Sequence, residues 1–110
     1  MSECIFCKIA SGEVPSEKLY EDDDLFVIRD INPLAPVHLL VIPKKHIPTL
    51  LDLTDEDMPL MEKIVKVARE MAKKEGVAER GFKFVINVNE EGGQRVFHLH
   101  CHILGGKKFD

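Results

Sequence analysis

The chain has 110 residues and a mass of 12.5 kDa, which suits one domain covering residues 1–110 and argues against a second core. Hydrophobic residues make up 45% of the chain and charged residues 31%, a balance that excludes general disorder. The net charge of −4 argues against nucleic-acid binding through a broad basic face. No apolar run reaches the ~20 residues that a membrane span needs.

The cysteine content indicates the cellular compartment. The chain has three cysteines, an odd number, and its N-terminus from Met1 to Cys4 shows no basic region followed by an apolar one. We therefore expect no signal peptide. The expected location is the cytoplasm, with the cysteines as reduced thiols or metal ligands rather than disulfides.

The first half of the chain predicts short strands separated by turns. Strands are expected at residues 19–20, 25–30 and 37–42, with an acidic hairpin turn at residues 21–24. Pro33 and Pro36 keep the segment before the third strand in a loop. That third strand is apolar except for His38, which predicts a central strand buried on both faces.

The second half predicts one long helix and a hairpin. Apolar residues recur at helical spacing over residues 55–74, between Thr54 as a capping residue and Gly76 as the stop. Two further strands are expected at residues 82–88 and 96–104, with turn residues 89–94 between them. With a short helix or turn at residues 4–9, this order predicts an α+β fold with a mostly antiparallel sheet of about five strands.

Three of the five histidines fall on one face of the last expected strand, at positions 98, 100 and 102. The residues that alternate with them are apolar and are expected in the core: Phe97, Leu99, Cys101 and Ile103. Strand residues four apart are separated by ~13 Å, so one metal ion cannot bind all three imidazoles. Neutral imidazoles are nucleophilic and pass protons, so this row suits attack on an anionic phosphorus atom.

The segment HLHCHILGG from His98 resembles the His-x-His-x-His signature of the histidine-triad (HIT) family, and most closely its Hint branch of purine nucleoside phosphoramidases. Four other segments match the family pattern in the same order: CIFCKI from Cys4, DINPLAPVH from Asp30, VIPKKH from Val41 and GGQ from Gly92. The resemblance implies a HIT-like fold. It also implies a hydrolase that cleaves the bond to the α-phosphate of purine nucleoside monophosphate derivatives, through a covalent nucleotidyl-histidine.

The resemblance also implies a role for each matching residue. His100 would be the nucleophile, and His102 would contact the phosphate and help protonate the leaving amine. His38 would support His102, and His98 completes the catalytic set. Asp30 would bind the ribose hydroxyls. The other nucleotide-binding residues would be Asn87, Gly93, Gln94 and Arg95 beside the phosphate, Ile5, Phe6, Ile9 and Ile28 around the purine, and Ile31. Without the resemblance, the residues around the purine would be expected in the core and Asp30 in a turn.

Two features depart from the family pattern. Arg95 stands where Hint proteins of animal type carry a small hydroxyl residue. Many members also have a longer, aromatic C-terminal tail, whereas this sequence ends at Asp110. We expect both differences to affect the preference for the leaving group.

The pair Cys4 and Cys7 allows three interpretations: a redox pair, a metal pair, or two apolar residues. A thioredoxin-like βαβ setting is absent, and two cysteines cannot complete a tetrahedral zinc site. His46 and His98 are the available partners, and some bacterial members of the family hold zinc in a similar arrangement. We therefore expect a structural zinc on Cys4, Cys7, His46 and His98, with the chemistry left to His100 and His102.

Other functions remain open from the sequence. The alternatives are a dinucleoside polyphosphate hydrolase of Fhit type and a nucleotide-binding sensor module. A structural domain that carries zinc but no nucleotide site is a third. We expect a homodimer, because one helix on one sheet leaves an apolar edge strand at residues 82–88 and apolar helix residues such as Met58 without cover.

Overall fold

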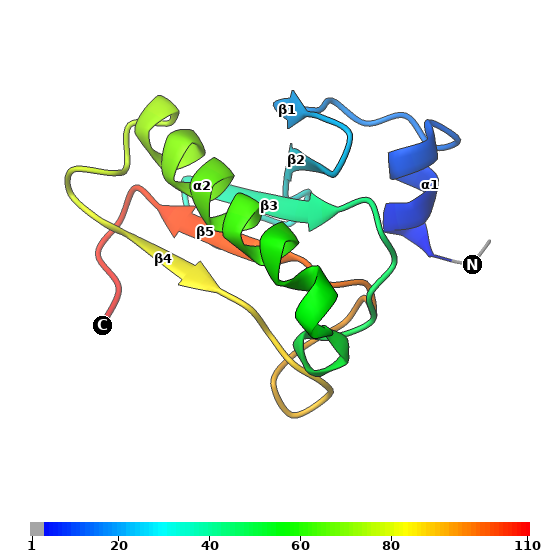
Figure 1. Cartoon of the computed structure of the whole chain (residues 1–110). Coiled ribbons are helices and arrows are strands. Elements are labelled where there is room, and N and C mark those ends of the chain that lie inside the picture. The colour runs from blue at the N-terminus through cyan, green and yellow to red at the C-terminus, as the bar shows by residue number, and fades with distance from the viewer. Residues whose placement is uncertain (1–3) are drawn as a thin grey trace.

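One five-stranded antiparallel sheet organises the computed structural model, which describes residues 4–110 (Figure 1). Residues 1–3, on which the expectation of no signal peptide partly rests, lie outside the described residues. In chain order the elements are α1 (Ile5–Ser11), β1 (Tyr20–Glu21), β2 (Leu25–Arg29), β3 (Val37–Pro43), the 3-10 turns Leu50–Asp52 and Asp55–Asp57, α2 (Met58–Lys74), β4 (Phe82–Val85) and β5 (Cys101–Gly105). The strands lie in the order β1-β2-β3-β5-β4, which confirms the expected α+β architecture.

The central strand β3 is buried on both faces, as its apolar run predicts. On one face Leu39 and Val41 join Ile64 of α2 in the larger core cluster. On the other face Leu40 and Ile42 pack with Phe6 of α1 in a smaller cluster. The long helix thus covers one side of the sheet, and the short N-terminal helix covers part of the other (Figure 1).

Helix α2 begins one 3-10 turn later than expected and ends at the expected residue. Asp57 accepts a hydrogen bond from the Thr54 backbone N–H at 2.9 Å, so aspartate replaces the usual glutamate in the capping box. The buried stripe of the helix consists of Ile64, Val67, Ala68, Met71 and Ala72. After the helix, Gly76 adopts a φ of +79°, the left-handed conformation that commonly stops a helix.

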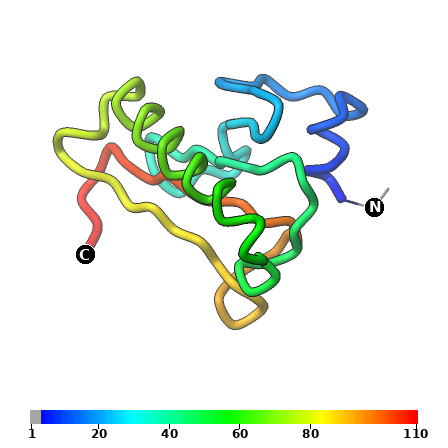
Figure 2. Tube along the Cα trace, viewed as in Figure 1, coloured from blue at the N-terminus to red at the C-terminus, as the bar shows by residue number. Residues whose placement is uncertain are grey.

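The last two strands are shorter than the sequence predicts. β4 ends at Val85 instead of residue 88, and β5 starts at Cys101 instead of residue 96. The backbone before β5 leaves the sheet because Leu99 N–H donates to the carbonyl of Ile47 at 2.7 Å, outside any strand. The side chains of this segment therefore do not alternate strictly between the two faces of the sheet. Phe97, which we expected in the core, is 46% exposed. Figure 2 shows this segment as a loop that precedes β5.

The described part of the chain, residues 4–110, contains no helix with the length and apolar character needed to cross a membrane. The edge strand β4 is open on one side, and its Phe84 is 38% exposed.

The core on the α2 side should dominate stability. Ile64 is fully buried, so Ile64→Ala should lower the free energy of unfolding by about 2–5 kcal/mol through lost burial and a residual cavity. The control Lys66→Ala, on the same helix with an exposed side chain, should change it by about 0.5 kcal/mol or less. Urea unfolding of both variants measures the difference, and equal effects would contradict the assigned core.

Candidate active site

The histidines gather on the face of the sheet opposite α2. His38 on β3 lies across from Leu104 of β5, and His102 on β5 lies across from Leu40 of β3. The two rings are therefore diagonal neighbours on the same face, with centroids 5.2 Å apart. His100, just before β5, follows on the same side, with its ring 5.0 Å from that of His102. The central part of the expected row is thus formed as the sequence predicts.

His100 is held in one tautomer by the backbone. Its Nδ1 lies 2.8 Å from the carbonyl oxygen of His98, and a carbonyl can only accept, so Nδ1 carries the proton. The other nitrogen, Nε2, is then left with a free lone pair. Phe6 of α1 packs edge-on against the ring at 5.1 Å, which limits its rotation. This combination makes a fixed nitrogen nucleophile.

A second hydrogen-bond chain sets the opposite tautomer in His102. Leu34 N–H donates to Nδ1 of His38 at 3.0 Å, so His38 carries its proton on Nε2. That nitrogen lies 2.9 Å from Nδ1 of His102 and donates to it. Nε2 of His102 must then carry the proton. A carboxylate oxygen of Asp30, 3.3 Å from Nε2 of His38, completes the group.

Burial keeps these two imidazoles neutral. Desolvation lowers the pKa of His38, although the nearby Asp30 carboxylate partly opposes the change. Desolvation also lowers the pKa of His102 to about 4, with smaller contributions from His100 and His38. In the absence of a ligand, His102 is therefore a neutral hydrogen-bond donor at pH 7.

The residues expected to bind the nucleotide divide into two groups. Phe6, Ile9 and Ile28 are buried together in one apolar cluster next to the histidines, whereas Ile5 is 39% and Ile31 is 90% exposed. Arg95 is also exposed at the surface. The buried residues form a wall beside the site, and the exposed ones lie at the surface, open to a ligand.

The loop between β4 and β5 is ordered by two amide side chains. Asn87 donates to the Gly92 carbonyl at 2.8 Å. Gln94 is buried and donates to the carbonyls of Pro48 and Val96, while its Oε1 accepts from Asn89 N–H. In this structure Gln94 therefore shapes the loop with its own side chain. At Gly92 a Cβ atom would lie 2.2 Å from the Val88 carbonyl oxygen, so no larger residue fits.

The four residues expected to hold zinc converge. Their ligand atoms, the sulfurs of Cys4 and Cys7 and one ring nitrogen each of His46 and His98, all lie within 4.8 Å of one another. Nδ1 of His98 lies 3.2 Å from the Cys4 sulfur, 3.6 Å from the Cys7 sulfur and 3.1 Å from Nδ1 of His46. Tetrahedral zinc with bonds of ~2.0–2.3 Å needs ligand atoms ~3.3–3.8 Å apart, so the arrangement fits zinc closely.

The tautomer of His98 supports the same conclusion. Nε2 of His98 donates to the Pro43 carbonyl at 2.7 Å, which leaves Nδ1 unprotonated and directed at the two cysteines. Metal-binding histidines usually donate their other N–H in this way. The group of Asp30, His38 and His102 is also compact, but it fails this test. His38 accepts at Nδ1, so its Nε2 must keep a proton and cannot bind a metal.

Two of the backbone groups that set these tautomers could not be predicted from the sequence. The Leu34 N–H and the Pro43 carbonyl act through the main chain, so their residue types carry no trace of the role. Only the two prolines around Leu34, which restrict its loop, hint at a fixed conformation there.

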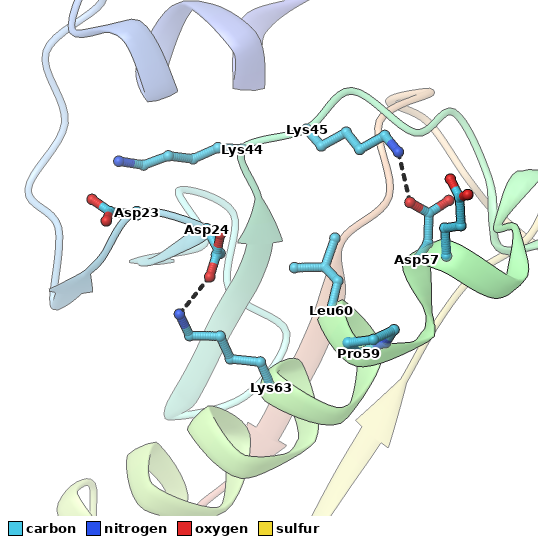
Figure 3. A pocket seen from close by; sticks show the side chains of 9 residues that line it. Asp23, Asp24, Lys44, Lys45, Asp57, Pro59, Leu60 and Lys63 are labelled. Carbon is cyan, nitrogen blue, oxygen red and sulfur yellow. Dashed lines mark hydrogen bonds and ion pairs between the residues drawn. The ribbon is translucent and has the colours of Figure 1, made fainter.

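A separate cavity of about 360 Å³ lies between the β2–β3 end of the sheet and the start of α2 (Figure 3). Two of its lysines pair with acidic side chains of the lining: Lys63 contacts Asp24 at 2.7 Å, and Lys45 contacts Asp57 at 2.6 Å. None of the histidines lines it. The lining as a whole has four acidic side chains and three lysines, so these two pairs do not balance all of its charges.

Comparisons with known proteins agree with the geometry. Residues 3–109 match the family described as "Scavenger mRNA decapping enzyme C-term binding". The purine nucleoside phosphoramidase of Escherichia coli K12 is 44% identical, over 96% of this chain and 88% of that protein. The structure of a histidine triad protein from Clostridium difficile is 48% identical, with a TM-score of 0.95 over 100% of this chain and 96% of that one.

A further comparison concerns the metal-binding candidates. The structure of a zinc-bound histidine triad family protein from Mycobacterium smegmatis is 32% identical, with a TM-score of 0.82 over 99% of this chain and 78% of that one. The extent and identity of these matches, together with the row of histidines, show that the chain belongs to the histidine-triad (HIT) family.

Proposed function

We propose that the protein is a phosphoramidase that cleaves the P–N bond of purine nucleoside phosphoramidates through a covalent nucleotidyl-His100. The observation that carries the proposal is the hydrogen bond from Nδ1–H of His100 to the His98 carbonyl, which leaves Nε2 free to attack. The phosphoramidase from E. coli, similar over nearly the whole chain, supports the same substrate class.

In the first step, the Nε2 lone pair of His100 attacks the α-phosphorus, and the P–N bond to the leaving amine breaks. The bonding pair stays on the amine nitrogen, which needs a proton. An anionic phosphoryl group beside His102 raises the pKa of the ring, so that Nδ1 takes up a proton from solvent as the substrate binds. The Nε2–H of His38, which donates to this Nδ1 in the free protein, then donates to the Asp30 carboxylate 3.3 Å away. The protonated ring gives its Nε2 proton to the amine and becomes neutral.

In the second step, water attacks the phosphorus and the bond to Nε2 of His100 breaks. The bonding pair returns to His100, and neutral His102 accepts the proton of the water. In the free protein His38 holds His102 in orientation through the 2.9 Å hydrogen bond, and we assign Asp30, next to His38, to the ribose hydroxyls. When the nucleoside monophosphate is released, His102 loses its Nδ1 proton to solvent, and both histidines are back in their starting states.

The zinc expected from the sequence is proposed as a structural ion on Cys4, Cys7, His46 and His98. When bound, it would link α1 to the loop after β3 and to the segment before β5. Thiolate ligands need a reducing environment to stay reduced, which is consistent with a cytoplasmic location. None of the proposed reaction steps passes through this ion.

His100→Ala should abolish turnover of adenosine phosphoramidate, because no other ring has a free nitrogen held in the same place. Binding of AMP should change by less than about tenfold, or ~1.4 kcal/mol, because most nucleotide contacts remain. Steady-state kinetics and calorimetry measure both. Residual turnover above a few per cent of the wild-type rate would remove His100 from the nucleophile role.

The pKa of His102 provides a test of its environment. Burial lowers this pKa to about 4, so the free protein should keep the ring neutral at pH 6, where an ordinary histidine is about three-quarters protonated. The unfolded chain binds this proton below about pH 6.5, so stability should fall as the pH drops from there toward 4. Nitrogen NMR of the ring, with and without AMP, checks the value. An unshifted pKa in the free protein, or one that AMP fails to raise, would contradict the proton-transfer role.

We also propose a homodimer formed through β4 and α2. The register of Phe84 with Ile103 puts Phe84 on the α2 side of the sheet, at the open edge, and Met58 and Val65 of α2 are exposed as well. Ile86, by contrast, packs against the core of the same chain. A second copy would cover the edge and the exposed apolar residues together.

Light scattering at micromolar concentration should give about 25 kDa, twice the mass of one chain of 12.5 kDa. Phe84→Glu should shift the mass to that of one chain, because a buried charge opposes association. Lys66→Glu, on the exposed surface of α2, serves as the charged control. A wild-type protein that is monomeric under these conditions would refute the dimer.

A further inference from the structure

His98 connects the metal group to the proposed nucleophile. Its side chain has no exposed surface, so it cannot touch a substrate. Its ring lies between the Pro43 carbonyl, to which Nε2–H donates, and the Cys4 sulfur near Nδ1. Its own carbonyl accepts from Nδ1–H of His100 at 2.8 Å. His98 thus contacts the metal group through its side chain and His100 through its backbone carbonyl.

The sheet does not fix this carbonyl. β5 begins only at Cys101, so residue 98 lies outside the ladder of strand hydrogen bonds. The nearest backbone anchor is the hydrogen bond from Leu99 N–H to Ile47. Leu99 N–H belongs to the same planar peptide group as the His98 carbonyl, so the direction of this carbonyl depends on the Ile47 contact, next to His46 of the metal group, as well as on what holds the His98 side chain.

Phe6 forms a second link between the same two places. It lies in α1 between Cys4 and Cys7, and its ring packs edge-on against both His98, at 5.8 Å, and His100, at 5.1 Å. α1 has only seven residues, too few to be stable alone, so its position depends on its contacts. Fixing Cys4 and Cys7 thus also fixes the aromatic ring beside His100.

We propose that occupancy of the Cys4, Cys7, His46 and His98 group by a divalent metal controls His100, with His98 as the positioning residue. With all four ligands joined, the His98 carbonyl and the Phe6 ring hold His100 with Nε2 unprotonated. Without the metal, the carbonyl and the ring move, and His100 exchanges between tautomers. This regulation rests on the proposed function only in assigning nucleophilic attack to His100.

The direct test compares the zinc-loaded protein with the protein after chelation, by nitrogen NMR of the His100 ring. The loaded protein should bind about one zinc per chain and show a single tautomer, protonated at Nδ1. After chelation the ring should show averaged tautomers and faster exchange of the Nδ1 proton. The rate of nucleotidyl transfer to His100 should fall at least about tenfold, while the Kd for AMP changes less than about threefold.

Two pairs of variants make the result specific. His46→Ala should lose zinc and show the averaged ring, whereas His46→Cys supplies another thiolate and should retain both zinc and the single tautomer. Cys4→Ser should behave like His46→Ala. Cys101→Ala removes a thiol that packs on the opposite face of the sheet, and should leave the ring signal unchanged.

An unchanged His100 tautomer after verified loss of zinc would overturn the proposal. Loss of the whole folded spectrum on chelation would overturn it too, since the metal would then be needed for the fold and not for one ring. Failure of the proposed function is recognised separately: a zinc-loaded protein that never transfers a nucleotide would refute the phosphoramidase. The ring measurement would still decide whether the metal group controls His100.

Discussion

The hydrogen bond between Nδ1–H of His100 and the His98 carbonyl is the interaction on which the rest of the site depends. It is available only because β5 begins at Cys101. If the strand extended back to residue 96, the backbone at position 98 would lie within the ladder instead of facing the His100 ring. Because the strand begins late, residues 96–100 lack ladder hydrogen bonds. The His98 carbonyl can then hold the His100 imidazole in one tautomer with one free nitrogen.

The two imidazoles that we assign to the reaction have opposite tautomers, and each tautomer is fixed by a backbone group. The His98 carbonyl puts the proton of His100 on Nδ1, whereas the Leu34 N–H, acting through His38, puts the proton of His102 on Nε2. One ring therefore offers a lone pair and its neighbour offers a proton. Burial favours the neutral form of His102 in the free protein.

The sequence predicts the regular parts of the fold well and the irregular parts poorly. Helix α2 and strand β3 follow from long apolar patterns that tertiary contacts reinforce, and Asp57 confirms the expected cap. The segment before β5 also has the alternating residue pattern of a strand. It is not a strand, because the Leu99 N–H donates to the carbonyl of Ile47 in a loop instead of to a neighbouring strand. A loop contact of that kind depends on two segments about fifty residues apart, and local patterning does not contain it.

The site could be predicted where chemistry lies in side chains and not where it lies in the backbone. The four metal-binding candidates and the adjacent histidines converge as their residue types suggest. Gln94 is different: the family resemblance implies a nucleotide contact, but its side-chain amide bonds to Asn89 and Val96 of its own loop and to the Pro48 carbonyl after β3. Side-chain type shows what a residue can bind, but the surrounding backbone decides whether it is free to do so.

The most direct measurement of this account is the location of the covalent intermediate. The protein would be mixed rapidly with adenosine phosphoramidate, quenched, digested and mapped by mass spectrometry. The account predicts an adenylyl group on His100 that forms and decays at rates compatible with turnover. An adduct on another histidine, or turnover at full rate with no adduct on His100, would contradict it.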